Sequence, residues 1–424
     1  MTTATSVAPA GKQPRIRDLD DPNFDPFLAD ELMYGDELDI YSLIHRMAEE
    51  NWIHPGEFRH LFGAAAALPK TPNHFMALGY DKCAEILLNP EVFSSEPLRA
   101  SIGISFGETI SYMDPPDHTR YRRIFQKAFL PQTVRKWAET IVQPVIEGLL
   151  DKVMDRGTLD LVQDFTIRYP FQVIYRQLKL PPEDILVFHK LAAAQGAFFF
   201  EPSQAIDAGR KLGEYFTPLI RDWRRRSPDE GDLISLLAHA EADGEVLPEQ
   251  VVVSFLRQLT TAAGDTTYRG TSNLMVGLLT NPDQLKAVRE DRSLVTPAIE
   301  EALRWEGPVT HSPRMAIRDF EMHGFTFRKG DTIDLVQASA SRDPDKFPDP
   351  DRFDIHRSRQ VRHMAFATGP HVCIGQHLAR VEMERALNAI LDRLPRLRFD
   401  PDKPPPEIRG VVLRAPKHVY ARFD

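Results

Sequence analysis

The chain has 424 residues, of which 42% are hydrophobic and 27% are charged, which is ordinary for a globular protein. Its 52 basic and 61 acidic side chains give a net charge of −9, which argues against a general nucleic-acid binder. Two cysteines, Cys83 and Cys373, are too few for a disulfide framework and suit a reducing compartment. The sequence shows neither an N-terminal signal peptide nor an apolar run approaching the about 20 residues that span a bilayer. We therefore expect a soluble cytoplasmic protein with no membrane partner.

The chain reads as one domain. We expect a flexible tail over residues 1–15 and a single domain over residues 16–424, because no linker, repeat or low-complexity block divides the remainder. Apolar residues recur at three- and four-residue spacing in several segments, which predicts helices over 138–154, 205–225, 247–279, 297–305 and 376–394. Strand signals are weaker: residues 315–336 alternate around turns at 323–324 and 329–330, which predicts hairpins, and 68–79 and 411–423 predict further strands. The expected fold is mainly α with a smaller β region (α+β).

In the first half of the chain, residues 114–131 (DPPDHTRYRRIFQKAFLP) predict a basic amphipathic helix. His118 and Arg122 are four residues apart, so both point to one side and can meet the same anion. Taken alone, a surface helix is the better interpretation. Further on, the phenylalanines at 198–200 fit an apolar access region and an ordinary buried helix equally well.

The segment 247–279 would be about 50 Å long as a helix, so it must cross the body of the protein. Its middle is rich in poor helix formers, including Gly264, Asp265, Thr266 and Thr267. Hydroxyls there can bond backward to carbonyls and bend the helix. A buried carboxylate is costly unless it is used or well paired, which makes Asp265 a functional candidate. The alternative is a kinked core helix whose Asp265 reaches solvent.

Two segments between the long helix and the cysteine-containing stretch carry further signals. Thr296 and Pro297 predict the N-cap and first residue of a short helix, on which Glu301 and Arg304 are spaced to form an ion pair. The segment 352–363 (RFDIHRSRQVRH) is basic and predicts either a docking patch or a solvated loop.

The stretch FATGPHVCIGQHLAR, residues 366–380, contains Cys373. Gly369 and Gly375 allow tight folding and the close approach of a flat group, and Phe366 can shield the sulfur from water. The amides of the helix that follows would lower the pKa of the thiol. A buried structural cysteine and a nucleophile remain alternatives, but a metal is the best partner for a thiolate here.

The pattern Phe366-x-x-Gly369-x-His371-x-Cys373-x-Gly375-x-x-Leu-Ala-Arg resembles the haem-binding loop of the cytochrome P450 family, with Ala367 where the family usually has glycine. Residues 262–267 (AAGDTT) are similar to the family's (Ala/Gly)-Gly-x-(Asp/Glu)-Thr signature, with Ala263 replacing the usual glycine. The resemblance spans from about residue 57 to near the C-terminus. It implies a bacterial-type soluble haem-thiolate monooxygenase with a long central helix over haem b.

The resemblance also implies roles for particular residues. Cys373 would be the axial ligand of the haem iron. Asp265 and Thr266 would be the acid–alcohol pair that delivers protons. The remaining haem-binding positions would be His118, Arg122, Arg314, His371, Phe366 and Gly375. Glu301, Arg304 and Arg352 would form a structural triad, and the substrate pocket would include Phe198, Phe199, Ala262, Val309 and His311.

The implied activity is hydroxylation of a hydrophobic small molecule, such as a terpenoid, steroid or aromatic compound, with O2. The chain carries no fused flavin or iron–sulfur segment, so electrons would come from a separate ferredoxin or flavodoxin with an NAD(P)H-dependent reductase. The basic segment 352–363 would steer an acidic partner of this kind. The alternatives are a peroxide-dependent peroxygenase and a non-catalytic haem-binding sensor. The intact Asp265–Thr266 pair speaks against both.

Overall fold

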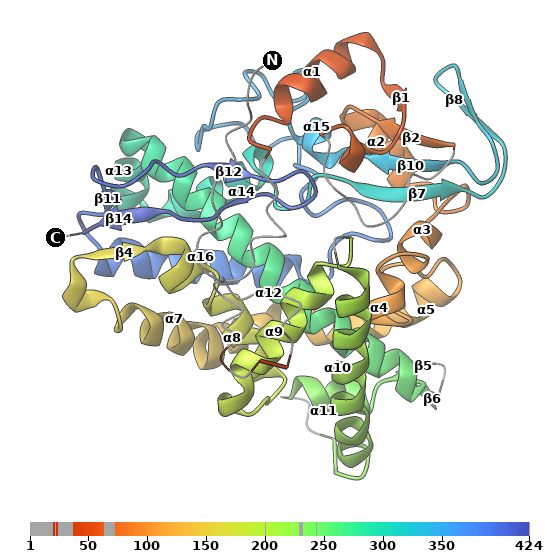
Figure 1. Ribbon diagram of the computed structural model, residues 1–424, viewed down its shortest axis with the longest axis horizontal. Helices are drawn as coiled ribbons and strands as arrows, with labels where there is room; N and C mark the ends of the chain where they lie inside the picture. The colour runs from red at the N-terminus through yellow and green to blue at the C-terminus, as the bar shows by residue number, and fades with distance from the viewer. Residues whose placement is uncertain are drawn as a thin grey trace.

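The computed structural model describes residues 20–21, 23, 37–62, 73–199, 201–228, 232–242 and 244–423. A mainly helical body lies beside a β-rich side that carries α1, α2 and α15, and α12 runs through the middle between them (Figure 1). This confirms the predicted fold class. The predicted tail, residues 1–15, lies outside the described residues, and a single domain over 16–424 stays a prediction. Within the described ranges, no helix has the length and apolar character needed to span a bilayer.

The helices follow the apolar periodicity closely. The described α-helices are α1 (Tyr41–Glu50), α2 (Tyr80–Leu87), α3 (Glu96–Arg99), α4 (Gly103–Phe106), α5 (Asp117–Phe125), α6 (Pro131–Trp137), α7 (Gln143–Leu150), α8 (Tyr169–Gln177), α9 (Ile185–Gly196), α10 (Pro202–Trp223), α11 (Leu233–Ala238), α12 (Glu249–Thr280), α13 (Pro282–Glu290), α14 (Val295–Trp305), α15 (Gln337–Ser341) and α16 (Gln376–Arg393). The predicted helix over 138–154 is divided into a π-helical segment, Ala138–Val142, then α7 and a short 3-10 turn, Met154–Arg156. Helix α14 begins before the predicted cap, because the 3-10 turn Arg292–Leu294 runs directly into it.

The largest sheet has the strand order β1-β2-β10-β7-β3, in which β10 runs parallel to β2 and the other pairs are antiparallel. Its strands are β1 (Ile53–Pro55), β2 (His74–Ala77), β3 (Phe93–Ser94), β7 (Ser312–Ala316) and β10 (Thr332–Leu335). The smaller sheets contain β4 (Thr158–Asp160), β5 (Glu241–Ala242), β6 (Glu245–Val246), β8 (Phe320–Met322), β9 (Phe325–Phe327), β11 (Arg398–Phe399), β12 (Ile408–Arg409), β13 (Ala415–Pro416) and β14 (Tyr420–Arg422).

One of the two predicted hairpins is correct. Strands β8 and β9 pair around residues 323–324, with Met322 opposite Phe325. The second predicted hairpin, around 329–330, is wrong, because β10 pairs with β7 and β2 instead of β9. Its central place in the large sheet explains this, since every residue of β10 is buried and needs partners on both edges. Part of the predicted strand 68–79 falls on residues outside the described ranges, and the described part contains β2 (His74–Ala77).

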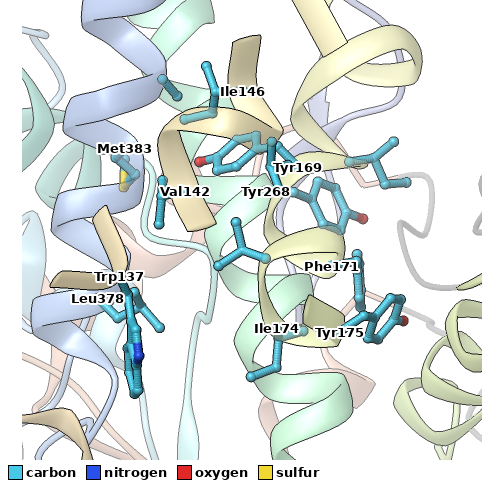
Figure 2. Close-up of a cluster of buried hydrophobic side chains, with 14 of the residues drawn as sticks. Trp137, Val142, Ile146, Tyr169, Phe171, Ile174, Tyr175, Tyr268, Leu378 and Met383 are labelled. Carbon is cyan, nitrogen blue, oxygen red and sulfur yellow. The ribbon is translucent and has the colours of Figure 1, made fainter. Parts of the chain in front are cut away.

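Helix α12 forms the centre of the core. It is a continuous α-helix of 32 residues, about 48 Å long, and most of its side chains are buried. Gly264 faces the ring of Phe171 on α8 so closely that a side chain at this position would clash with the ring. Figure 2 shows the neighbouring cluster, in which Tyr268 of α12 lies among aromatic and aliphatic side chains of α6, α7, α8 and α16. Close packing of this kind holds α12 in place on the side facing α8.

Candidate active site

A cavity of about 380 Å³ lies between α12 and the loop that precedes α16. Its walls come from segments that are far apart in the sequence, from Leu98 to Met383. Apolar side chains predominate. They include Leu98, Ile110, Phe129, Phe255, Leu259, Ala262, Ala263, Val309 and Phe366. An enclosed apolar space with a few polar groups is typical of a small-molecule site.

The cysteine loop is folded tightly around one end of this cavity. The amide of Cys373 donates to the carbonyl of Phe366 at 2.9 Å, and the amide of Ala367 donates to the carbonyl of Met364 at 2.8 Å. Gly369 has a positive φ of 74°, and a Cβ there would lie 2.5 Å from the carbonyl oxygen of Leu87. Glycine is therefore required at 369 for both conformation and space. Ala367 is also left-handed, with a φ of 56°, which costs a non-glycine residue about 1–2 kcal/mol.

The thiol of Cys373 is a free cysteine that opens into the cavity. The surrounding protein desolvates it and raises its pKa, while the amides of Gly375 and Gln376 act in the opposite direction. The helix amides therefore act on the thiol pKa in the predicted direction, but burial is the larger contribution and the net pKa is raised. A thiolate at this position needs a positively charged partner, such as a metal centre, to be stable.

Four polar side chains predicted to bind carboxylates come together beside this loop. His118 and Arg122 project from successive turns of α5, Arg314 from β7, and His371 from the loop; the rings of His118 and His371 are 4.1 Å apart between centroids. Arg122 donates to the carbonyl of Val372 at 2.6 Å, and His371 is 3.2 Å from the hydroxyl of Ser95.

Burial lowers the pKa of three of these groups. Desolvation lowers the pKa of His118 to about 4, of His371 to about 2 and of Arg314 to about 10. Arg314 donates only to the adjacent carbonyl of Pro313, at 2.8 Å, among the described residues. Both ring nitrogens of His118 are buried and have no partner in the described part of the chain. Buried donors of this kind call for acceptors from outside the chain.

These residues fit haem. The unpartnered donors suit two propionates. A Cβ at Gly375 would meet only the sulfur of Cys373 among the described residues, at 4.0 Å, so the space beside the sulfur is open. Over the residues that are described, His, Cys, Asp and Glu side chains do not gather in threes to hold a bare metal ion. A single thiolate beside a cavity is therefore better suited to a metal that carries its own ring ligand.

On the α12 side of the cavity, the predicted acid–alcohol pair is divided between two environments. Thr266 lines the cavity, and its hydroxyl donates backward to the carbonyl of Ala262 at 3.2 Å. Asp265 is buried and does not line the cavity; its carboxylate accepts from Arg269 at 3.2 and 3.3 Å. Sequence reasoning missed Arg269, although its i, i+4 spacing from Asp265 was a usable signal.

The structure divides the predicted substrate-pocket residues into two groups. Ala262 and Val309 line the cavity, but Phe198, Phe199 and His311 do not. Phe198 is fully buried, and Phe199 packs on it with centroids 5.8 Å apart. His311 turns toward the ring of Phe58, 5.0 Å away, and the hydroxyl of Thr310 at 3.0 Å. These three side chains therefore belong to the packing around the pocket.

The structure also corrects the Glu/Arg/Arg triad. Arg304 makes two bonds of 2.8 Å to the carboxylate of Glu301, as predicted from their spacing. The third member is Arg357, whose Nε lies 3.2 Å from Glu301 Oε1. Arg352 is exposed and contributes only its backbone carbonyl, which accepts from Arg304 at 3.1 Å and from Arg357 at 2.9 Å. Arg357 is accordingly occupied inside the fold and is not part of an open basic patch.

One cavity-lining residue gave no signal in the sequence. Glu382 projects from α16 into the cavity wall, and burial raises its pKa well above the ordinary value. One of its carboxylate oxygens is buried without a hydrogen-bond partner in the described residues. A neutral carboxyl group is therefore favoured at this position.

The cavity, the thiol that opens into it and the unpartnered donors define a haem-thiolate protein. Comparison with known proteins agrees: the family described as "Cytochrome P450" matches residues 204–423. The monooxygenase PikC of Streptomyces venezuelae is 33% identical over 360 residues, covering 81% of this chain and 85% of that protein. Cytochrome P450-terp of a Pseudomonas species is 31% identical over 332 residues, covering 74% and 76% respectively.

Solved structures show the same likeness. CYP109E1 from Bacillus megaterium in complex with testosterone has a TM-score of 0.79 and 26% identity, covering 91% of this chain and 99% of that one. P450BioI in complex with an acyl carrier protein ligated to hexadec-9Z-enoic acid has a TM-score of 0.79 and 29% identity, covering 91% and 98%. The chain belongs to the cytochrome P450 family. It is a P450 monooxygenase, an oxidoreductase, and its cofactor is haem b.

Proposed function

We propose that this monooxygenase hydroxylates a hydrophobic small molecule with O2, using electrons from a separate ferredoxin and its reductase. One oxygen atom enters a C–H bond and the other leaves as water, which consumes two electrons and two protons. The observation that carries the proposal is the predominantly apolar cavity into which both Cys373 and Thr266 open. Haem bound to Cys373 supplies the oxygen-activating chemistry, and the thiolate's electron donation favours O–O cleavage.

The residues around the cavity have separate tasks. Arg122 and Arg314 hold the propionates and compensate their charge, and His118 and His371 add hydrogen bonds. Thr266 can turn its hydroxyl from the carbonyl of Ala262 into the cavity and donate a hydrogen bond there. Asp265 is the proton source, and it must leave its bonds to Arg269 to face the cavity.

The lining of the cavity supports an apolar substrate. Leu98, Ile110, Phe129, Phe255 and Leu259 form an apolar surface that excludes water from the reacting carbon. The steroid seen in the related CYP109E1 complex and the fatty acyl group seen with P450BioI support an apolar substrate here, whether terpenoid, steroid or aromatic. Cys83 and Cys373 are both free, which suits the reducing cytoplasm, where we propose the enzyme works.

The test begins with the cofactor. Carbon monoxide added to the reduced holoenzyme should give the far-shifted Soret band of thiolate ligation, and absence of that band overturns the proposal. NADH consumption should then yield hydroxylated product when ferredoxin and reductase are supplied. Product with peroxide alone would favour a peroxygenase, and no product under either condition across many apolar compounds would favour a sensor.

The role of Thr266 can be measured in the same assay. Thr266→Ala should continue to consume NADH but release peroxide instead of product, because the hydroxyl no longer directs protons in the cavity. Unchanged coupling would refute this role. The substitution removes one hydroxyl from a half-buried position, so the fold should be retained, as the carbon monoxide band would show.

The ferredoxin would dock beside the cysteine loop, where Arg359 and Arg362 are exposed. Changing both to glutamine should weaken ferredoxin binding most at low salt, because screening already removes the attraction at high salt. Arg318, exposed between β7 and β8, provides the matched control. An equal effect of Arg318→Gln, or an unchanged salt profile in the double variant, would count against this docking surface.

A further inference from the structure

Among the polar side chains that line the cavity, Gln258 and Ser111 form a hydrogen-bonded pair. Gln258 of α12 donates through its amide nitrogen to the hydroxyl oxygen of Ser111, which lies between α4 and α5, at 2.7 Å. Both residues line the cavity, and both are half-buried. Among the cavity-lining residues, Leu98, Ile110, Phe129, Phe255 and Leu259 provide apolar surface but no hydrogen-bonding side chain.

The pair has unused hydrogen-bonding capacity. With the amide nitrogen bonded to Ser111, the amide oxygen of Gln258 remains as an acceptor and the Ser111 hydroxyl remains as a donor. If the amide is turned by 180°, its nitrogen becomes the open donor and the Ser111 oxygen the open acceptor. Either way the pair offers one donor and one acceptor. Covering it with a purely apolar ligand would desolvate both without compensation.

The position of the pair indicates how long the ligand is. Gln258, Ala262 and Thr266 are spaced by four residues, so they lie along one face of α12. Two turns separate Gln258 from Thr266, about 12 Å along the helix axis. The small side chains of Ala262 and Ala263 line the cavity between them. A ligand that reaches from one end of this face to the other is therefore elongated.

The charges of the lining restrict the ligand further. Arg122 and Arg314 are the two arginines that line the cavity, and no lysine lines it within the described residues. Their two positive charges match the two propionates of haem. A substrate carboxylate at the far end would have no cation left to pair with, and burying an unpaired charge is costly.

We propose that the substrate is an elongated, neutral, apolar alcohol whose hydroxyl binds the Gln258–Ser111 pair while the carbon to be oxidised lies toward Thr266. The hydroxyl donates to Gln258 and accepts from Ser111, so it satisfies both open groups at once. A ketone can only accept and a hydrocarbon can do neither. This inference rests on the proposed function but tests a different property, the selection of one polar group by the pocket.

The experiment titrates the ferric holoenzyme and follows the spin-state shift, which reports binding without turnover. Two skeletons are each offered in three forms: dodecane, dodecanol and dodecanoate, and androstane, androstanol and the androstane carboxylate. On at least one skeleton the alcohol should bind about tenfold or more tightly than both the hydrocarbon and the carboxylate. The proposal is overturned if, on both skeletons, the hydrocarbon or the carboxylate binds as tightly as the alcohol. It is also overturned if neither alcohol binds.

Variants then test which residues cause the preference for the alcohol. Gln258→Leu and Ser111→Ala should each reduce the preference for the alcohol over the hydrocarbon to about threefold or less, with hydrocarbon binding retained. Ser312→Ala, which removes another cavity-lining hydroxyl, should leave the preference unchanged. An alcohol preference that survives in both Gln258→Leu and Ser111→Ala refutes the assignment. The carbon monoxide band of each variant shows that haem is bound through the thiolate. Absence of this band in the wild-type protein would overturn the proposed function. A normal band without a preference for the alcohol would overturn only this inference.

Discussion

Replacing Arg357 by methionine would remove the third member of the Glu301 network while retaining much of the side chain's apolar volume. The guanidinium is mostly buried, with 12% of the side chain exposed, and donates to Glu301 and to the carbonyls of Pro348, Asp349 and Arg352. A hydrogen bond to a charged group contributes about 1.5–3 kcal/mol. The carbonyl contacts lie at the exposed end, where water can replace them.

Glu301 would not be left alone by this change. It keeps two bonds of 2.8 Å from Arg304 and one of 2.9 Å from the amide of Asp354. The loss should therefore stay below the about 3–5 kcal/mol expected when a buried charge loses its only partner. We expect Arg357→Met to lower the free energy of unfolding by about 2–3 kcal/mol.

The assay is urea unfolding of the holoenzyme, followed by circular dichroism for the helices and by the Soret band for the cysteine loop. Arg352→Met is the matched control, because the Arg352 side chain is exposed and makes no bond to Glu301; it should change stability by less than about 0.5 kcal/mol. Equal losses in the two variants, or a larger loss in Arg352→Met, would refute the assignment of Arg357 to the network.

Two other changes test the loop and the ion pairs that surround it. Ala367→Gly should raise the free energy of unfolding by about 0.5–1 kcal/mol, since relief of the left-handed strain exceeds the added chain entropy; a lower thermal midpoint would contradict this. For Glu300, burial alone would raise the pKa, but hydrogen bonds from His363 and Arg380 outweigh it and lower the pKa from 4.5 to about 2. Glu300→Gln should thus cost about 2–3 kcal/mol at pH 7. The difference in the free energy of unfolding between this variant and wild type should shrink as the pH falls below about 4.5, because the carboxyl group takes up a proton in the unfolded state while it stays ionised in the folded state. A difference in this free energy that is constant from neutral pH to about 3.5 would argue against the depressed pKa.

What the sequence could predict depends on how far apart the interacting residues are. The cysteine loop and the middle of α12 are each a continuous stretch of sequence, so their residue types and spacing indicated both elements. The same residues carried the family resemblance that implied the cofactor. Glu301 and Arg304 are three residues apart on one helix and were paired correctly. Arg357, in contrast, reaches Glu301 across 56 positions, and no local rule distinguishes it from Arg352.

The pocket shows the same dependence. Val309 is fixed by a bridge to Leu413, whereas His311, two residues on, turns to Phe58. Which of them faces the cavity is decided by packing partners more than a hundred residues away along the chain. The Gln258–Ser111 bond joins positions 147 apart, so only the folded chain reveals it.

The two halves of helix α12 have different roles. Its second half is fastened to the body of the protein, since Thr271 bonds to Tyr169 at 2.6 Å and Ser272 to Thr166 at 2.7 Å. Its first half presents Gln258, Leu259 and the alanines at 262 and 263 to the cavity. Substrate range can thus drift, in nature or in a mutant library, through substitutions at these few positions, while the fastened half preserves the scaffold's thermal tolerance.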